Sequence, residues 1–353
     1  MFSPSDFHDI VSGRRQGASA AILRAGLAAA EIPYKFAIRY RNLRYDRGHN
    51  ETHRVDAPVI SVGNLTLGGT GKTPMVAWLV EWFLNNNAIP AIVSRGYGRR
   101  NGELNDEARE LASRFPNVCH IQNPDRVAGA RQAIAEHHAN VIIMDDGFQH
   151  RRLHRDLDIV LIDALQPFGF GRIFPRGSLR EPLEGIGRAD VAILTRADNI
   201  PDGRKQELRE FYQAAQPDLL WLESANIATR LVNHTGQTQP LSRLTENLVA
   251  FCAIGNPAGF ERTLESAGGN PVAMIEFPDH HHYGSKDFSR IQAVMDSSHA
   301  KLAVCTCKDL AKLDSDQIGD GEGREVYALE VTTSIQPSDQ LVPKLKDLLE
   351  PDA

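Results

Sequence analysis

The stretch that decides the fold is VISVGNLTLGGTGKT, which runs from Val59 to Thr73. It begins with β-branched residues typical of a strand, continues as a glycine-rich loop and ends in Lys72 and Thr73, where a helical pattern begins. A strand, a glycine-rich loop and a helix N-terminus are the parts of a phosphate-binding P-loop. Glycines suit such a loop because, without a Cβ atom, backbone N–H groups can turn toward a phosphate.

The residues of this loop have predicted roles. Lys72 is expected to place its ammonium on the β- and γ-phosphates, and the hydroxyl of Thr73 is expected to bind Mg²⁺. Thr66 stands where the first glycine of the motif usually lies, and an ordinary glycine-rich turn is the alternative. The helix that follows at once favours phosphate binding. The predicted nucleotide-binding residues of the loop are Thr66, Leu67, Gly68, Gly69, Thr70, Gly71, Lys72 and Thr73.

Length and composition narrow the class of protein. The chain has 353 residues, which favours two domains, and it is 42% apolar and 24% charged, as in soluble globular proteins. The net charge is −6, so the chain lacks the overall positive charge that would attract nucleic acid. The four cysteines include one C-x-C pair, which is a poor zinc signal, so reduced thiols in a cytosolic compartment fit best. No obligate protein partner is indicated.

The N-terminal region has no apolar stretch of the roughly 18–20 residues that a membrane span needs. The nearest, Gln16 to Ala30, is interrupted by Arg24. Arg14 and Arg15 allow a twin-arginine signal, but the charge inside the apolar stretch disfavours it. Ala18 to Ala30 is expected to form a helix that Pro33 ends.

The segment after Pro33 is basic and aromatic. Phe36, Tyr40 and Leu43 share one helical face, and cations flank them. This pattern favours a helix lying on an anionic membrane surface, and a packing helix with solvated arginines is the alternative. We therefore predict a membrane-associating helical segment over residues 1–50. The flanking cations are Lys35, Arg39, Arg41, Arg44 and Arg47.

From Val59 onward, strands and helices alternate, which predicts an α/β fold: a P-loop NTPase-like, doubly wound, mostly parallel sheet. This P-loop domain is expected over residues 51–223. The polar segment 224–243 predicts a β-hairpin linker, and residues 244–353 predict a second, smaller α/β domain.

Asp145 and Asp146 follow the apolar strand predicted over Asn140 to Met144. In P-loop proteins an acidic residue at such a strand end holds Mg²⁺, which prefers carboxylate oxygens. Ligands collect at the carboxyl ends of parallel strands, so the whole DDGFQH run is expected to face the phosphates. A turn that happens to begin with two aspartates is the alternative.

Five motifs occur in order: GNLTLGGTGKTP, SRGYGRR, DDGFQHRRL, LREPL and FPDHHHY. Together they resemble the tetraacyldisaccharide 4′-kinase family of lipid A biosynthesis, over nearly the whole chain. The resemblance implies Mg-ATP-dependent phosphorylation of the 4′-hydroxyl of a lipid-linked glucosamine disaccharide 1-phosphate. It also implies peripheral attachment to the cytoplasmic face of the bacterial inner membrane. Thr66 in place of the glycine is usual in this family.

The resemblance also implies roles for individual residues of this sequence. Tyr97 and Arg180 are expected near the nucleotide, and His150 is expected to take part in catalysis. Glu181 is expected beside the metal with Thr73, Asp145 and Asp146.

The family's catalytic base is matched by Asp106, although Asn105 replaces the glycine that usually precedes it. The histidine paired with that base is matched by His280. The two come from different predicted domains, so they are expected to pair when the domains close over substrate. Helix capping by Asp106 is the alternative.

Two further motifs leave alternatives open. The run His280 to His282 also allows a zinc site, but no third ligand is signalled nearby, and His281 and His282 fit polar loop residues better. The run Thr306 to Asp309 could contact substrate, or it could simply begin a helix.

A different class of function is a P-loop ATPase or GTPase switch, or a metallochaperone, that binds a protein partner. Thr195 to Asp198 lies where GTPases carry their base-reading Asn-Lys-x-Asp, but its residues do not fit. Such a switch also needs neither a basic, aromatic N-terminal helix nor a second α/β domain, so the kinase is favoured.

Overall fold

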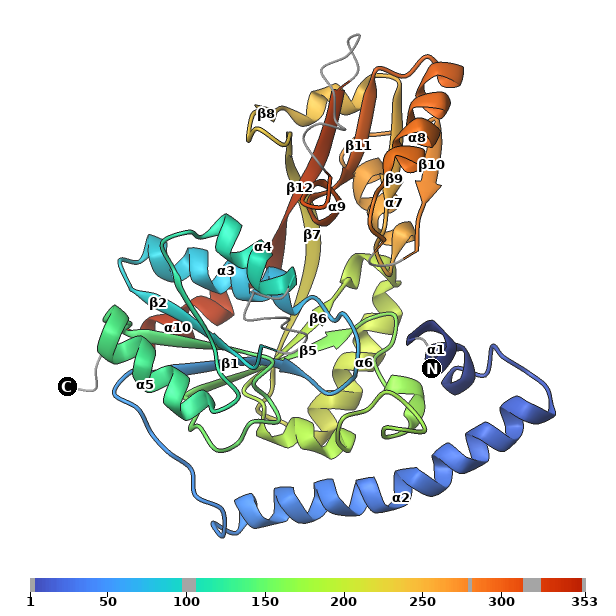
Figure 1. The fold of residues 1–353 in the computed structure, drawn as a ribbon. Coiled ribbons are helices and arrows are strands. Elements are labelled where there is room, and N and C mark those ends of the chain that lie inside the picture. Colours follow the sequence, from blue (N-terminus) through green and yellow to red (C-terminus); the bar gives the residue numbers. More distant parts are fainter. Residues whose placement is uncertain (1–3, 97–105, 279–280, 314–324, 351–353) are drawn as a thin grey trace. The chain divides into compact units, whose positions relative to one another are not determined.

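The structure is a computed structural model that describes residues 4–96, 106–278, 281–313 and 325–350. The chain divides into two compact units. Unit 1 comprises Met1–Ala225 and Ile335–Ala353, and unit 2 comprises Asn226–Ser334. Figure 1 shows their helices and strands.

Unit 1 is built on a parallel sheet in the order β3-β2-β4-β1-β5-β6-β7. The inner strands are buried along their whole length, which explains why their sequences are continuous apolar runs. The predicted doubly wound parallel sheet is confirmed. The strands are β1 Val59–Asn64, β2 Pro90–Ser94, β3 Cys119–Gln122, β4 Val141–Asp145, β5 Leu157–Asp163, β6 Val191–Thr195 and β7 Leu220–Val232.

Helices cover both faces of this sheet (Figure 1). On one face, α3 (Lys72–Asn85), α4 (Asp106–Arg114) and α10 (Leu341–Asp347) pack on alternate side chains of the strands. On the other face lie α5 (Arg126–His137) and α6 (Asp202–Ala215). Short 3-10 helices of unit 1 occur at Gly169–Gly171, Leu183–Arg188, Ala197–Asn199 and Ser338–Gln340, and unit 2 has one at Leu241–Thr245.

The N-terminal part of unit 1 forms α1 (Pro4–Val11) and α2 (Ala18–Asp46). The predicted break at Pro33 is wrong, because α2 runs through this proline and is 29 residues long in all. Proline removes one helical hydrogen bond, but contacts with the body of the unit hold α2 on both sides of it. Before the proline, Glu31 accepts from the backbone N–H of Ile173 at 2.9 Å, and after it Asn42 donates to Glu181 at 2.8 Å.

Unit 2 is a smaller α/β layer with strand order β10-β9-β11-β12-β7. Strands β10, β9, β11 and β12 run parallel, and β8 pairs antiparallel with the end of β7. Helix α8 (Ser285–Ser298) packs on one face and α7 (Pro257–Ser266) on the other, while α9 (Cys307–Leu310) follows β11. The strands are β8 Thr238–Gln239, β9 Leu248–Cys252, β10 Ala273–Glu276, β11 Leu302–Thr306 and β12 Glu325–Gln336.

The predicted bounds of the linker and the second domain are wrong at both ends. Instead of a linker at 224–243, β7 continues without a break from unit 1 into unit 2, and the predicted hairpin is its pairing with β8. At the other end, β12 leads the chain back to unit 1. There Leu341 and Leu345 of α10 are buried in the core beside α3. The apolar side of this last helix gives no sequence signal of which core it joins.

Candidate active site

The P-loop joins β1 to α3, as predicted. Gly71 is the N-cap of α3 with φ 84°, and Gly68 has φ 118°, so both occupy the left-handed region that glycine adopts without strain. Lys72 and Thr73 open the helix, and Thr73 is buried. The hydroxyl of Thr70 is buried and has no hydrogen-bond partner among the described residues. An unmatched donor at a helix N-terminus is suited to an anion such as a phosphate.

The first half of the P-loop is held by the segment before Arg180. Thr66 forms a bridge with Leu179, and the backbone N–H of Leu67 donates to the carbonyl of Ser178 at 2.6 Å. The backbone N–H of Arg180 in turn donates to the carbonyl of Leu65 at 2.7 Å. The P-loop and the L-R-E segment are therefore one backbone-bonded structure.

Asp145 ends β4 and pairs with Val62 of β1, so both aspartates lie beside the strand that leads into the P-loop. Arg180 donates from Nη1 to both carboxylate oxygens of Asp146, at 2.7 and 2.8 Å. The ammonium of Lys72 lies 3.5 Å from the same carboxylate. Burial alone would raise the pKa of Asp146, but these cations lower it below its ordinary value.

Arg126 is a site residue that sequence reasoning missed. It is the first residue of α5 and is buried, and its charge acts on Asp146 and Asp145. Its Nε atom has no partner within the described parts of the chain, and burial lowers the pKa of its guanidinium. A cation is unfavourable at a helix N-terminus, so an arginine directly after the N-cap Asp125 was the available signal.

His150 lies in the same region at the end of the DDGFQH run. Burial, followed by the charge of Arg126, lowers the pKa of His150 to about 4, so the imidazole is neutral at pH 7. Its Nε2 atom is buried without a partner among the described residues. A neutral ring can donate or accept one hydrogen bond at this atom, depending on its tautomer.

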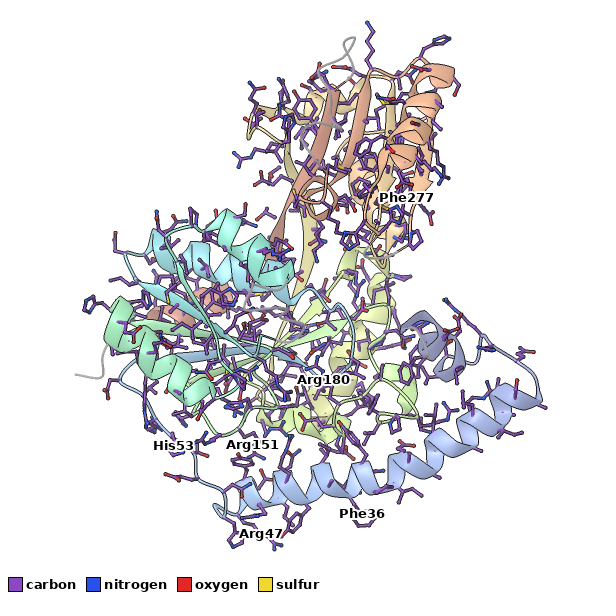
Figure 2. The ribbon with its side chains drawn as sticks, in the orientation of Figure 1. Phe36, Arg47, His53, Arg151, Arg180 and Phe277 are labelled. Carbon is purple, nitrogen blue, oxygen red and sulfur yellow. The ribbon has the colours of Figure 1, made fainter. Side chains whose placement is uncertain are left out.

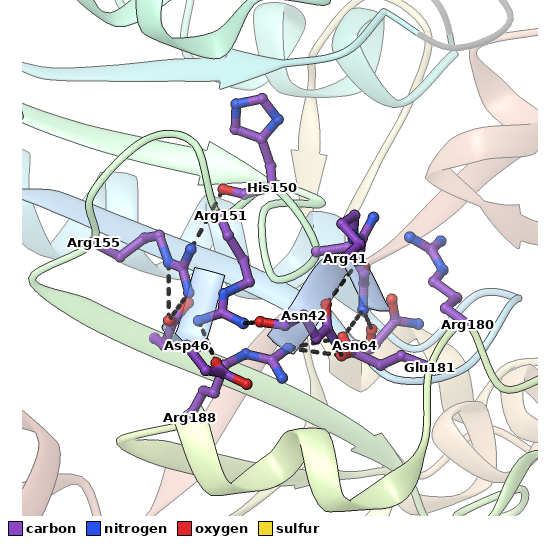
Figure 3. Close-up of polar contacts among 12 residues, drawn as sticks. Arg41, Asn42, Asp46, Asn64, His150, Arg151, Arg155, Arg180, Glu181 and Arg188 are labelled. Carbon is purple, nitrogen blue, oxygen red and sulfur yellow. Dashed lines mark hydrogen bonds and ion pairs between the residues drawn. The ribbon is translucent and has the colours of Figure 1, made fainter. Parts of the chain in front are cut away.

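Glu181, whose predicted role as a metal ligand stays a prediction, is surrounded by hydrogen-bond donors. It is fully buried, and both its oxygens accept from Arg188 at 2.9 Å. Gln149 donates to one oxygen at 3.0 Å. Asn42 donates to the other at 2.8 Å (Figure 3). These N–H groups occupy lone pairs of both carboxylate oxygens. Glu181 therefore organises the segment around the site.

The carboxyl ends of β5 and β6 also reach the P-loop. Arg196 follows β6 with φ 57°, forms an ion pair with Asp163 at the end of β5 and donates to the carbonyl of Gly69 at 2.9 Å. Burial raises the pKa of Asp163, and the Arg196 guanidinium opposes that rise. The segment from Thr195 to Asp198, whose residues do not fit the base-reading motif of GTPases, thus supports the glycine-rich loop through Arg196.

Three predicted site residues receive little or no structural description. Asp106 is the first residue of α4, but its side chain lies outside the described part of the structure. Tyr97 and His280 lie outside the described residues. The predictions for these three residues stay predictions.

The motifs left open in unit 2 have structural roles where they are described. His281 stacks on Phe277 and contacts Asp287 at 3.0 Å, and His282 is exposed. Thr306 caps α9, and the fully buried Asp309 accepts from Tyr283 at 2.9 Å. In the described ranges no three His, Cys, Asp or Glu side chains form a group that could hold a metal by themselves.

Helix α2 leaves one apolar face open to solvent, which we call the outer face: Ile22, Ile32, Phe36, Tyr40 and Leu43. Phe36 is 73% exposed and lies on this face (Figure 2). Across the described ranges, no helix has the combination of length and apolarity that crossing a membrane requires. Exposed aromatic residues along one helix are typical of an interfacial helix.

Comparisons with known proteins bear on what this site does. A family model described as tetraacyldisaccharide-1-P 4′-kinase matches residues 23–350. The chain is 34% identical to the tetraacyldisaccharide 4′-kinase of Halothermothrix orenii over 83% of each chain. It is 35% identical to that of Geobacter sulfurreducens, over 87% of this chain and 89% of the relative. The structure is similar to LpxK from Aquifex aeolicus, crystallised with ATP, with a TM-score of 0.72 and 29% identity over 93% of this chain and all of the other.

Proposed function

The chain belongs to the tetraacyldisaccharide-1-P 4′-kinase family, and from this premise we propose how its residues carry out ATP-dependent phosphorylation of a lipid A precursor. The acceptor is the 4′-hydroxyl of a lipid-linked glucosamine disaccharide 1-phosphate. The observation that carries the proposal is the meeting of Lys72, Arg180 and Asp146 at the P-loop. The alternative function, a P-loop switch or metallochaperone, is not favoured because the family match covers residues 23–350.

Lys72 and Arg180 supply the positive charge for phosphoryl transfer. In the structure both cations face Asp146. A triphosphate bound at the start of α3 would bring its own negative charge to the same cations. Lys72 would then neutralise the oxygens on which charge spreads in the transition state, while Arg180 and the P-loop N–H groups orient the phosphates. The charge of buried Arg126, which acts on both Asp145 and Asp146, would add to this positive field, and the neutral ring of His150 could offer one hydrogen bond.

Thr73 and Asp145 are the residues we propose to hold Mg²⁺. Both are buried, and both offer the hard oxygen atoms that this ion prefers. Mg²⁺ usually takes one or two protein ligands and completes its shell with phosphate oxygens and water, so a large protein cluster is not required. When bound, the ion would neutralise charge on the phosphate oxygens. Asp146 accepts two hydrogen bonds from Arg180 and would therefore orient the Arg180 guanidinium.

Asp106 is the proposed base for the 4′-hydroxyl, with His280 as its partner. A hydroxyl is a weak nucleophile, and a carboxylate assisted by an imidazole can take its proton during transfer. The family resemblance and the place of Asp106 at the start of α4 support this proposal.

The outer face of α2 is the proposed attachment to an anionic membrane surface. Along the helix its exposed apolar residues are interspersed with the exposed Arg39 and Arg44. Because the acceptor carries acyl chains, an enzyme that works on it must reach a lipid surface. We place that surface on the cytoplasmic side of the bacterial inner membrane, where ATP is available.

One assay tests the function. Purified protein is mixed with Mg-ATP and the disaccharide 1-phosphate, and the lipid product is read by mass spectrometry. We expect a product heavier by one phosphoryl group, formed only when acceptor and ATP are both present. ATP hydrolysis without any lipid product would contradict the proposal.

A further inference from the structure

The inner side of α2 carries one amide that reaches the active-site scaffold. Asn42 donates from Nδ2 to the carboxylate of Glu181 at 2.8 Å (Figure 3). Its Oδ1 atom accepts from Arg41 at 3.3 Å, which orients the amide with its N–H side toward Glu181. A helix whose opposite side is the proposed membrane surface thus bonds directly to a fully buried carboxylate.

The carboxylate of Glu181 depends on each of its donors. Besides Asn42, Arg188 donates to it at 2.9 Å and Gln149 at 3.0 Å. A buried charge is costly unless it is paired and hydrogen-bonded, so losing one donor leaves part of that cost uncompensated. Gln149 also donates to the carbonyl of Asn64, at the end of the strand that leads into the P-loop.

The residue directly before Glu181 is Arg180, which donates to both carboxylate oxygens of Asp146. Helix α2 contacts this residue as well, because Tyr34 donates from its hydroxyl to the carbonyl of Arg180 at 3.4 Å. The position of the Arg180 guanidinium is therefore tied to α2 at two points, the backbone of Arg180 and the side chain of Glu181.

A second link fixes the same turn of α2 to the DDGFQHRR run. Arg151 donates to the backbone carbonyl of Asn42 at 3.1 Å and pairs with Asp46 at 2.7 Å. Its guanidinium also lies over the ring of Tyr45, 5.1 Å from the centroid. This link holds the backbone that carries the Asn42 amide in register with the site.

We propose that Asn42 is a positioning residue for phosphoryl transfer: through Glu181 it places the Arg180 guanidinium against Asp146 and the phosphates. The proposal rests on the proposed function. It gives α2 a role in the rate of transfer that is separate from membrane attachment.

The test compares Asn42→Leu with Asn247→Leu. Leucine keeps the approximate shape of asparagine but cannot donate a hydrogen bond. Asn247 is a matched control, because its exposed amide donates to a carbonyl, that of Ser298, at 2.6 Å in unit 2. With detergent-dispersed acceptor, we expect Asn42→Leu to lower kcat about tenfold, as for loss of one bond to a charged group. The KM for lipid and the binding to vesicles should change less than about twofold.

A reversed pair separates positioning from stability. Asn42→Asp sets two carboxylates against each other and should lower kcat further. Adding Glu181→Gln exchanges the two roles, because the new glutamine amide can donate to the new aspartate carboxylate. The kcat of the double variant should therefore be higher than that of Asn42→Asp alone. Unchanged kcat in Asn42→Leu, or no recovery in the double variant while all variants melt like wild type, would overturn the inference alone. An inactive wild-type protein would overturn the proposed function as well.

Discussion

The ammonium of Lys72 lies 3.5 Å from the carboxylate of Asp146, which joins the P-loop to the end of β4. Arg180 binds the same carboxylate through both oxygens. Two cations suited to phosphate therefore share one anion. We infer that nucleotide phosphates compete with Asp146 for these cations. Asp146 would then pair with Lys72 and Arg180 when no nucleotide is bound, and it would orient both side chains toward the phosphates.

This arrangement predicts different defects for the two adjacent aspartates. Asp145→Asn should raise the Mg²⁺ concentration needed for half-maximal activity, because a carboxamide is a weaker ligand, and excess Mg²⁺ should restore part of kcat. Asp146→Asn should lower kcat without rescue by Mg²⁺, because it loosens Arg180 and Lys72. Mg²⁺ titrations of initial rate check both variants. Equal activity of both with wild type at low Mg²⁺ would remove the carboxylates from the site.

The proposed base predicts strong coupling between Asp106 and His280. Asp106→Ala should reduce kcat by about 10²–10⁴-fold, the usual range for loss of a general base, with ATP affinity nearly unchanged. In the Asp106→Ala background, His280→Ala should reduce kcat by a much smaller factor than it does in the wild type. Two residues that act as a unit do not have additive effects. The exposed neighbour His282→Ala is the control. Fully additive losses would leave Asp106 as a helix residue and the base unassigned.

Much of the nucleotide site could be predicted from sequence because its groups lie in short motifs. The P-loop and the DDGFQH run each place their residues by local geometry, at a strand end or a helix start. The sequence did not indicate Arg126, because burial brings its charge to the site, nor the donors to Glu181, because they come from distant segments such as Asn42.

For the fold as well, features that depend on local sequence could be predicted, and features that depend on distant contacts could not. Apolar runs and their alternation with helices predict a parallel sheet, because both depend on local pattern. The continuity of α2 through Pro33 and the return of α10 to unit 1 depend on tertiary contacts. Local propensity cannot report such contacts, so these predictions were wrong.

The buried imidazole of His150 predicts a pH effect on stability. Its pKa is about 4 when folded, against an ordinary value of 6.5. Between these values the unfolded chain binds more protons, so stability is present above about pH 6.5 and is lost as pH falls toward 4. His120, whose pKa burial also lowers to about 4, acts in the same direction.

Thermal melts at pH 7 and pH 5 check this effect. The drop in Tm should be smaller in His150→Gln than in wild type, because that group no longer charges on unfolding. His234→Gln, in an exposed turn, should keep the wild-type difference. An equal drop in all three proteins would mean that His150 is not held neutral by burial.

The outer face of α2 predicts membrane attachment that depends on both aromatic residues and charge. Phe36→Ser with Tyr40→Ser should shift the protein to the supernatant when anionic vesicles are sedimented, and high salt should weaken binding of the wild type. Ile89→Ser with Val272→Ser is the matched control, since these side chains are 50% and 51% exposed elsewhere. Vesicle binding that survives both the α2 substitutions and salt would show that α2 only packs.

The central claim is that the Lys72 site transfers the γ-phosphate of ATP to the 4′-hydroxyl of the acceptor. Its most direct test is single-turnover transfer of labelled γ-phosphate to the disaccharide 1-phosphate by wild type, Lys72→Ala and the exposed Lys344→Ala of α10. Loss of the Lys72 ammonium should cost about 3 kcal/mol or more of transition-state stabilisation, by analogy with one oxyanion donor, and slow transfer by about 100-fold or more. Lys344→Ala should match wild type. Transfer by Lys72→Ala at a rate near that of wild type would contradict the account.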